Sequence, residues 1–285
     1  MSQSLSKSSA PEPEFDPGLD IRFLRDTLDF RYGPGVFGPE PEYRSLDAIR
    51  GSLQDPNCTG PDRVYAIAMD VGRLEDLDEL KRRMLLFGIV KYAKGRLGKG
   101  PVRSQGHVHA IAPHCGWSTP ELFEIWEGRG IIYCQEKSGD DPGRCFAIEA
   151  GPGEQVVIPP DWAHYVVNAD MHSPLIFGAW CDRQYGFDYT QMRAHHGLAW
   201  FPLMADDGKI SWEANPTYSA NELECRKTRN YPELGLSPTT PIYEQFRGNP
   251  ESVQWVSDPA RFSNLWPRFE PWAVRNHPTC LPAFL

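Results

Sequence analysis

Short segments rich in β-branched and aromatic residues follow one another between residues 63 and 181, and this run constrains the fold more than any other feature. Clusters of Gly, Pro and Asp separate the segments, which is typical of strands joined by turns. This pattern favours an antiparallel barrel or double sheet over repeated βαβ units. We expect nine strands: Arg63–Val71, Met84–Ala93, Val102–Ala110, Glu121–Trp126, Gly130–Gln135, Cys145–Glu149, Gln155–Ile158, His164–Val167 and Pro174–Cys181.

The composition supports this fold class and excludes several kinds of partner. The 285 residues include 27 Pro, which blocks helix interiors and argues against a mainly helical protein. A net charge of −9 without a basic stripe argues against nucleic acid. The longest apolar stretch, Met84–Val90, is too short to cross a membrane. With no secretory signal visible, we expect the 7 Cys to be free thiols in a reducing cytoplasm.

The two ends of the chain differ in character from the strand-rich region. Residues 1–17 are rich in Ser and Pro and are expected to form a flexible leader, before a main domain over 18–217. Residues 218–285 form an extension with little periodicity but several Trp. It is either an arm packed over the barrel or a partner subunit, or a small helical appendix. Ser45–Leu53 is expected to be a short helix capped by Ser45, and Leu19–Tyr32 fits either helix or strand.

Three histidines and one glutamate form the candidate site. His107 and His109 are two residues apart in an expected strand, so their side chains point to the same face. Glu121 and His164 each begin another expected strand. Three imidazoles and one carboxylate suit Fe(II), Mn(II), Zn(II), Ni(II) or Co(II), whereas Ca(II) prefers oxygen ligands. We therefore predict one divalent metal ion held by these four side chains, with the barrel mouth open to substrate.

The spacing of the first three ligands resembles the first motif of the cupin superfamily. His107-x-His109 followed by Glu121-x6-Gly128 is similar to that motif, although eleven residues separate His109 from Glu121 where the usual pattern has three or four. Glu124 is a rival ligand, but in a strand it faces away from Glu121. We prefer Glu121 because its distance to Gly128 matches the motif.

The segment from Gly153 to Asn168 resembles the second cupin motif. Its spacing is Gly-x5-Pro-x-Asp-x2-His-x3-Asn, with Asp161 where the motif has Gly and His164 as the ligand. The resemblance implies an all-β protein with a jelly-roll-like antiparallel barrel over 18–217, an N-terminal extension and a C-terminal arm. The metal motifs then lie within residues 98–189.

Among cupins, the chain resembles the archaeal-type glucose-6-phosphate isomerases. The similarity covers about residues 30 to 217, and residues 218–285 have no recognisable counterpart. It rests on local matches at Gly98–Lys99, Ser104–Ala110, Glu121–Phe123, Glu127–Gly130, Ile158–His164 and Gly186–Tyr189.

This resemblance implies a sugar phosphate beside the metal, near Ser104, Gly106 and Tyr189. We expect Lys99 to add an ammonium group to the phosphate contacts. Several residues depart from the family pattern near the substrate and leave the metal ligands intact. Ser104 for Thr keeps the hydroxyl, and Gln105 for Lys loses a charge. Phe123 for Tyr and Phe187 for His remove two polar groups, and Cys181 stands where the family tends to have Tyr.

We expect a metal-dependent aldose–ketose isomerase that interconverts glucose 6-phosphate and fructose 6-phosphate in the cytoplasm as a homodimer, with Fe(II) as the first choice of metal. Glu121 and His164 are the expected catalytic residues, and Glu121 is the base that moves a proton between C1 and C2. A hydride shift would need the metal and no base. Three alternatives stay open: an isomerase or epimerase of a different sugar or sugar phosphate, a cupin Fe(II) dioxygenase, and a binding module without turnover.

Overall fold

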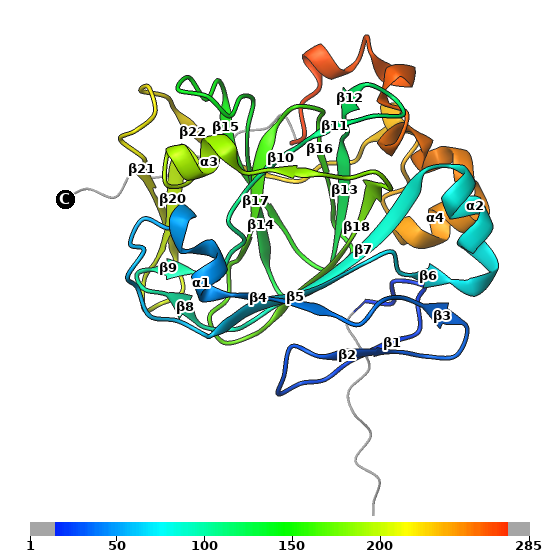
Figure 1. The fold of residues 1–285 in the computed structure, drawn as a ribbon, viewed down its shortest axis with the longest axis horizontal. Coiled ribbons are helices and arrows are strands. Elements are labelled where there is room, and N and C mark those ends of the chain that lie inside the picture. Colours follow the sequence, from blue (N-terminus) through cyan, green and yellow to red (C-terminus); the bar gives the residue numbers. More distant parts are fainter. Residues whose placement is uncertain (1–14, 273–285) are drawn as a thin grey trace, which may run out of the picture.

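Two facing β-sheets form the body of the computed structural model, which describes residues 15–272 (Figure 1). The six-stranded sheet contains, in spatial order, β16 (Gln155–Ile158), β13 (Glu121–Glu127), β18 (Leu175–Asp182), β7 (Leu85–Tyr92), β5 (Arg63–Met69) and β4 (Glu42–Ser45). The four-stranded sheet contains β17 (Ala163–Asn168), β14 (Gly130–Gln135), β15 (Cys145–Ala150) and β22 (Leu223–Lys227). Every neighbouring pair is antiparallel except β15 and β22. The predicted antiparallel barrel is therefore confirmed.

Smaller elements surround these sheets. Six two-stranded pairs are formed by β1 (Ile21–Phe23) with β2 (Phe30–Tyr32), β3 (Val36–Phe37) with β6 (Gly72–Arg73), β8 (Arg96–Leu97) with β9 (Gly100–Pro101), β10 (Val108–His109) with β19 (Phe187–Asp188), β11 (Ile111–Ala112) with β12 (Trp117–Ser118), and β20 (Trp200–Met204) with β21 (Ile210–Ala214). The α-helices are α1 (Leu46–Ile49), α2 (Leu77–Arg82), α3 (Thr190–Ala194) and α4 (Ile242–Gly248). The 3-10 helices are η1 (Arg50–Ser52), η2 (Leu74–Asp76), η3 (Pro232–Leu234), η4 (Pro250–Val256), η5 (Pro259–Phe262) and η6 (Trp266–Arg268). Among the described residues, none of these helices is long and apolar enough to span a membrane.

The period-two alternation of β13 sends its side chains into two different cores. Phe123 and Ile125 point between the two sheets, where they join Phe146 of the four-stranded sheet in the inner core. Leu122 and Trp126 point to the outer face of the six-stranded sheet, where they pack in a cluster that includes residues of α4 and η4. Each face of this strand is therefore buried for a different reason: one closes the barrel, and the other carries the C-terminal extension.

The outer face of the four-stranded sheet is covered by the segment that follows β19. Tyr133 and Tyr165 stack at a ring-centroid distance of 4.8 Å, and the ring of Trp212 lies 5.7 Å from that of Tyr133. Met192 of α3 and Leu198 belong to the same buried cluster. In Figure 1, α3 and the β20–β21 pair lie at one side of the molecule, and α4 lies at the other. Both sheets are thus covered, which makes the barrel interior a protected place for a polar site.

The structure corrects one expectation about secondary structure and decides another that the sequence left open. The expected strand Val102–Ala110 is interrupted at Gly106, whose φ of +91° is incompatible with extended backbone, and only Val108–His109 forms a strand. Isolated bridges still tie Arg103 to Val167 and His107 to His164. The ambiguous segment Leu19–Tyr32 contains the two short strands β1 and β2.

The two ends of the chain are less simple than expected. The predicted leader lies outside the described residues except for residues 15–17, where Phe15 packs against the outer cluster of the six-stranded sheet. The predicted extension first supplies strand β22 to the four-stranded sheet. It then forms η3, α4 and the three 3-10 helices η4, η5 and η6, in that order. Its residues Phe246 and Trp255 are buried in the same outer cluster. Residues 218–272 therefore pack on the barrel in largely helical form.

The cysteines follow the sequence-based expectation only in part. Free thiols are found at Cys58, Cys115, Cys134, Cys145 and Cys181. Cys225 is disulfide-bonded, so the expectation of free thiols is wrong at that position. Cys280 lies outside the described residues. An odd count of scattered cysteines in the sequence therefore does not exclude a disulfide.

Candidate metal centre

Four side chains from three parts of the barrel converge at one point. His107 lies just before β10, His109 lies in β10, Glu121 begins β13, and His164 lies in β17. One ligand atom from each residue lies within 4.8 Å of those of the other three. The sheet geometry explains the convergence, because the bridge between His107 and His164 ties the first segment to the third, while Glu121 stands on the inner face of β13.

The carboxylate of Glu121 lies between two imidazoles. Its Oε2 atom is 3.2 Å from Nε2 of His109 and 3.1 Å from Nε2 of His164. Its Oε1 atom accepts a hydrogen bond from the thiol of Cys181 at 3.2 Å. The two oxygens therefore have different surroundings, one directed at the histidines and the other at the cysteine.

Backbone carbonyls orient two of the imidazoles. Nδ1 of His109 is 2.7 Å from the carbonyl oxygen of Thr119, and Nδ1 of His164 is 3.2 Å from that of Trp162. Since a carbonyl only accepts, each Nδ1 donates to it, and Nε2 is the ring nitrogen that faces the common centre of the four residues. This is the usual way in which proteins prepare histidine as a metal ligand.

Two buried nitrogens test whether a metal fits. Nε2 of His107 and Nε2 of His109 are buried and have no partner in hydrogen-bonding geometry, although Oε2 of Glu121 approaches the latter. A buried polar atom without a partner costs free energy, so such atoms call for a ligand. A divalent cation at the point where the three imidazoles and the carboxylate converge would satisfy this need.

The electrostatics keep Glu121 ionised and act in opposite directions on two of the imidazoles, those of His107 and His109. Burial alone would raise the pKa of Glu121, but hydrogen bonds and charges from His109 and His164 outweigh it and hold that pKa well below its ordinary value. Burial, reinforced by the neighbouring histidines, lowers the pKa of His107. For His109, burial lowers the pKa, but the contacts with Glu121 outweigh it and raise the pKa.

A narrow cavity of about 70 Å³ is lined by three of the four candidate ligands, His107, Glu121 and His164. Its polar lining comes from side chains on β4, β5, the loop before β10 and the segment after β19, and its apolar lining comes from the inner faces of β5, β7, β13 and β18. Ser104, Gly106 and Tyr189 line this cavity, together with Phe123 and Phe187. A substrate in the cavity would therefore lie directly beside the metal ligands.

Comparison with known proteins now identifies the family. Residues 47–221 match the family described as Glucose-6-phosphate isomerase (GPI). This chain belongs to the glucose-6-phosphate isomerase family. A glucose-6-phosphate isomerase of Thermococcus kodakarensis is 29% identical over 196 residues, covering 67% of this chain and 95% of the relative. That of Pyrococcus furiosus is 29% identical over 193 residues, covering 67% of this chain and 94% of the relative.

A solved structure of recombinant oxalate oxidase in complex with glycolate also overlaps with the chain. The sequences are 14% identical, and the overlap covers 48% of this chain and 60% of that chain at a TM-score of 0.33. The family assignment itself rests on the match over residues 47–221, which includes all four candidate ligands and every strand of the two sheets except β4 and β22.

The remaining residues predicted for this glucose-6-phosphate isomerase family site are not all brought together. Ser104 accepts a hydrogen bond from the Val166 backbone at 3.2 Å, and the ring centroid of Tyr189 is 6.2 Å from that of His107. Lys99, by contrast, is exposed and lines a separate hollow on the other side of Arg103. Because Lys99 does not line the metal cavity, the structure gives it no position as a phosphate contact.

Two aromatic residues stand where the family pattern has polar groups. The ring centroid of Phe187 is 4.2 Å from that of His107, and the ring centroid of Phe123 is 5.9 Å from that of His164. Both rings line the cavity. The departures noted in the sequence therefore fall directly on the substrate side of the metal ligands.

Glu124, the rival candidate ligand, lies outside the metal cluster and makes structural hydrogen bonds. It lies on the outer face of β13, where its Oε1 accepts from the Ile242 backbone at 3.0 Å and its Oε2 accepts from the Trp126 indole at 3.1 Å. Burial raises its pKa to about 8. Since Ile242 begins α4, this carboxyl group attaches the C-terminal extension to the barrel.

Sequence reasoning missed several contributors to the site. The carbonyl of Thr119 lies inside the long insertion between His109 and Glu121, where residue type gives no signal for a backbone contact. Cys181 was noticed only as a departure, although it contacts Glu121. Arg44 lines the cavity but stands far from every motif in the sequence. Only three-dimensional placement reveals it.

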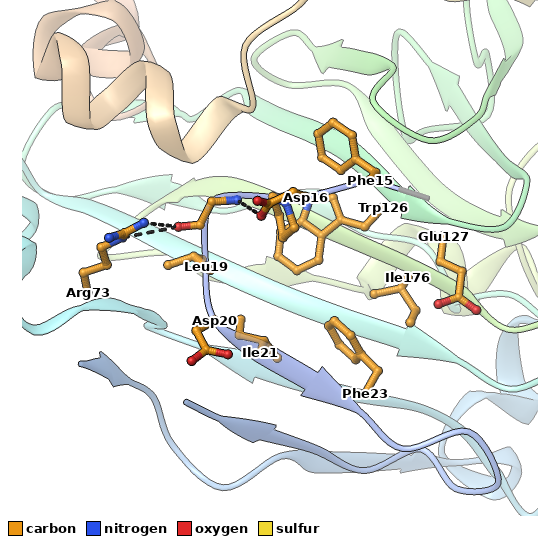
Figure 2. Close-up of a pocket in the computed structure, with 12 residues that line it drawn as sticks. Phe15, Asp16, Leu19, Asp20, Ile21, Phe23, Arg73, Trp126, Glu127 and Ile176 are labelled. Carbon is orange, nitrogen blue, oxygen red and sulfur yellow. Dashed lines mark hydrogen bonds between the residues drawn. The ribbon is translucent and has the colours of Figure 1, made fainter. Parts of the chain in front are cut away.

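A larger hollow of about 470 Å³ lies elsewhere, beside the N-terminal segment (Figure 2). Phe23 and Trp126 supply apolar walls, and Arg73 stands at one end. The guanidinium of Arg73 is already used, because it donates to the Gly18 carbonyl at 2.6 Å and to Glu244 at 3.1 Å. None of the four candidate ligands lines this hollow, so its size does not make it the chemical site.

Proposed function

We propose that this protein is a metal-dependent aldose–ketose isomerase that interconverts glucose 6-phosphate and fructose 6-phosphate. The observation that carries the proposal is the cluster of His107, His109, Glu121 and His164 beside a cavity, in a chain of the glucose-6-phosphate isomerase family. These four residues would hold one divalent metal ion. When bound, the ion supplies Lewis-acid stabilisation of the negative charge that develops on the substrate oxygens.

The residues of the chain would divide the remaining work. The isomerisation removes a proton from the carbon next to a carbonyl and returns one to the carbonyl carbon, while a second proton passes from the substrate hydroxyl oxygen to the former carbonyl oxygen. The lowered pKa of Glu121 keeps its carboxylate ionised, and Oε1 is the oxygen that does not face the two imidazoles. We assign the proton transfer to this oxygen, with His164 positioned as ligand and catalytic partner at the same carboxylate.

The cavity walls would exclude water from the reacting carbons. Phe123 and Phe187 cover the histidines on the substrate side, so a bound sugar is separated from bulk solvent. Ser104 and the Gly106 backbone would contact the substrate from the loop before β10, and Tyr189 would contact a sugar hydroxyl. A metal-assisted hydride shift is the alternative route, and it would leave the migrating hydrogen unexchanged with solvent.

A coupled assay tests the function. Purified protein reconstituted with Fe(II) or Mn(II) should convert fructose 6-phosphate to glucose 6-phosphate, and a chelator should abolish the activity until metal is restored. Running the reaction in D₂O tests the proton-transfer route, since incorporation of deuterium at the reacting carbon requires it and a hydride shift incorporates none. Absence of turnover with every divalent metal tested would reject the proposal. Oxygen consumption in place of isomerisation would favour an Fe(II) dioxygenase.

One observation favours a second substrate class. Phe123 and Phe187 make this part of the cavity less polar than the family pattern predicts. A different sugar or sugar phosphate is therefore the second candidate substrate, and a panel of aldoses and ketoses with and without phosphate would rank them. We further propose Fe(II) as the resident metal, a homodimer as the assembly and the cytoplasm as the location. Elemental analysis, sedimentation and cell fractionation test these three proposals.

A further inference from the structure

A sugar phosphate needs a cationic partner, and the metal cavity has one basic side chain besides its histidines. Among the residues that line it, Arg44 is the only Lys or Arg. Arg44 lies in β4, at the edge of the six-stranded sheet, and its Cα partner across the ladder is Tyr65 of β5. Lys99, which the sequence suggested for this role, lines a different hollow.

The guanidinium of Arg44 has a neutral internal partner, the hydroxyl of Tyr65, and no close charged one among the described residues. Within the described part of the chain, its one ion pair is with Glu42 at 3.7 Å, and the Glu42 side chain is 73% exposed. Exposed ion pairs at such distances contribute little. Arg103 differs, because it is buried and donates to the backbone carbonyls of Ser52 and Ser104. The charge near the loop that is free to bind a ligand is therefore that of Arg44.

Two phenols stand close to Arg44 in the same wall of the cavity. Burial raises the pKa of Tyr65 to about 12, and the nearby Arg44 guanidinium acts in the opposite direction. Burial also raises the pKa of Tyr189, again opposed by Arg44. Both hydroxyl groups therefore stay protonated at neutral pH and remain donors. A guanidinium beside two phenolic donors is a suitable set for an oxyanion.

The two ends of the cavity differ in solvent exposure. The side chains of Glu121 and His164 are 9% and 2% exposed, whereas that of Arg44 is 37% exposed. The interior of about 70 Å³ holds only a few waters, at roughly 10–15 Å³ for each. A hexose phosphate with C1 and C2 at the metal must therefore extend its C6 end towards the more open part of the cavity, where Arg44 lies.

We propose that Arg44 binds the phosphate group of the substrate and sets the preference of this protein for phosphorylated over unphosphorylated sugars. The inference rests on the proposed isomerase function. It assigns to a residue of β4 the role for which the sequence offered Lys99. A planar guanidinium can donate two parallel hydrogen bonds to one phosphate, which a lysine cannot do.

Three variants test the assignment in the metal-loaded full-length protein. Arg44→Ala should raise the KM for fructose 6-phosphate about 10- to 100-fold, the range expected for lost hydrogen bonds to a charged group, with a smaller change in kcat. Arg44→Lys should recover part of the loss. Arg63→Ala is the matched control, because Arg63 is on the adjacent strand, is exposed and stacks over Tyr43 outside the cavity lining.

The outcomes separate this inference from the proposed function. An unchanged KM in Arg44→Ala, or an equal rise in Arg63→Ala, would overturn the role of Arg44 while leaving the isomerase assignment intact. If the wild-type protein does not isomerise fructose 6-phosphate, the functional proposal fails. Calorimetric titration with fructose 6-phosphate and with inorganic phosphate then decides on Arg44: weaker binding of both to Arg44→Ala supports the assignment, and equal binding contradicts it.

Discussion

Glu121 and Glu124 are three residues apart on the same strand, both are buried, and the protein holds their carboxyl groups in opposite states. On the inner face of β13, two histidines lie within 3.2 Å of Glu121 and its pKa is lowered. On the outer face, Glu124 has one backbone N–H and one indole N–H as partners, and its pKa is raised to about 8.

The difference shows that burial alone does not decide the charge of a carboxyl group. Burial is the largest influence on both residues and raises both pKa values. What separates them is the charge of their partners, because imidazoles stabilise an anion and neutral N–H donors do so only weakly. The inner face of β13 is therefore built to hold a cation, and the outer face is built to attach the C-terminal extension.

The largest expected effect on activity comes from substituting Glu121, the carboxylate on the inner face of β13. Glu121→Gln should lower kcat by about 10²- to 10⁴-fold, because it removes both a metal ligand and the proposed base. Metal content after gel filtration should also fall. Glu124→Gln is the matched control and should keep metal and turnover within several-fold of the wild type. Equal losses of kcat and metal content in both variants would contradict the assignment of metal binding to the inner face alone.

The outer face should matter for stability and not for chemistry. The ring of Phe246 in α4 lies 5.0 Å from that of Trp180 on β18, and both residues are fully buried. Phe246→Ala should lower the free energy of unfolding by about 3–5 kcal/mol, as expected for a buried aromatic residue. Chemical denaturation measures this value. The metal content and kcat of the folded variant should stay unchanged, and a loss of metal would show that the two faces are coupled.

The raised pKa of Glu124 predicts a pH dependence of a definite sign. Its folded pKa of about 8 is above the ordinary value of 4.5, so its contribution to stability is complete below pH 4.5 and is lost as the pH rises through 8. Between pH 5 and pH 8, the wild-type free energy of unfolding should fall by a few kcal/mol more than that of Glu124→Gln, which stays neutral throughout. Parallel pH profiles for the two proteins would disprove this assignment.

The smallest effect is expected at the thiol that contacts Glu121. Cys181→Ala removes the hydrogen bond to Oε1, but a thiol is a weak donor. The expected loss in kcat is within about tenfold, with the metal content preserved. Cys181→Ser should restore most of the activity. A loss as large as that of Glu121→Gln would mean that the thiol takes part in metal binding or proton transfer.

Local sequence patterns predicted the barrel and the convergence of the four candidate ligands. β14 and β16 begin and end at the predicted residues, because Gly130 and the turn before Gln155 mark clear boundaries. His107 and His109 converge as two residues on one strand face should, although Gly106 shortens the strand before them. Strand periodicity also placed Glu124 on the opposite face from Glu121. These features depend on residues close together in the sequence.

Features that depend on distant residues could not be predicted. β22 pairs with β15 across a long stretch of sequence, and nothing in residues 223–227 identifies that partner. Arg44 reaches the metal cavity only because β4 joins the edge of the six-stranded sheet. Lys99 was assigned by its neighbourhood in the sequence, yet it lies in the turn between β8 and β9 and lines another hollow. Tertiary placement decides each of these cases.

The parallel pairing of β22 with β15 has a consequence for how the chain assembles. Until residues 223–227 arrive, β15 is an outermost strand that pairs with β14 along one edge and has unpaired hydrogen-bonding groups along the other, and most of its side chains are apolar. A nascent chain therefore exposes an unpaired strand edge that can pair with other chains while later residues are still being translated. Truncation before Leu223 would leave that edge of β15 without a partner strand, so shortened chains of this protein are expected to aggregate.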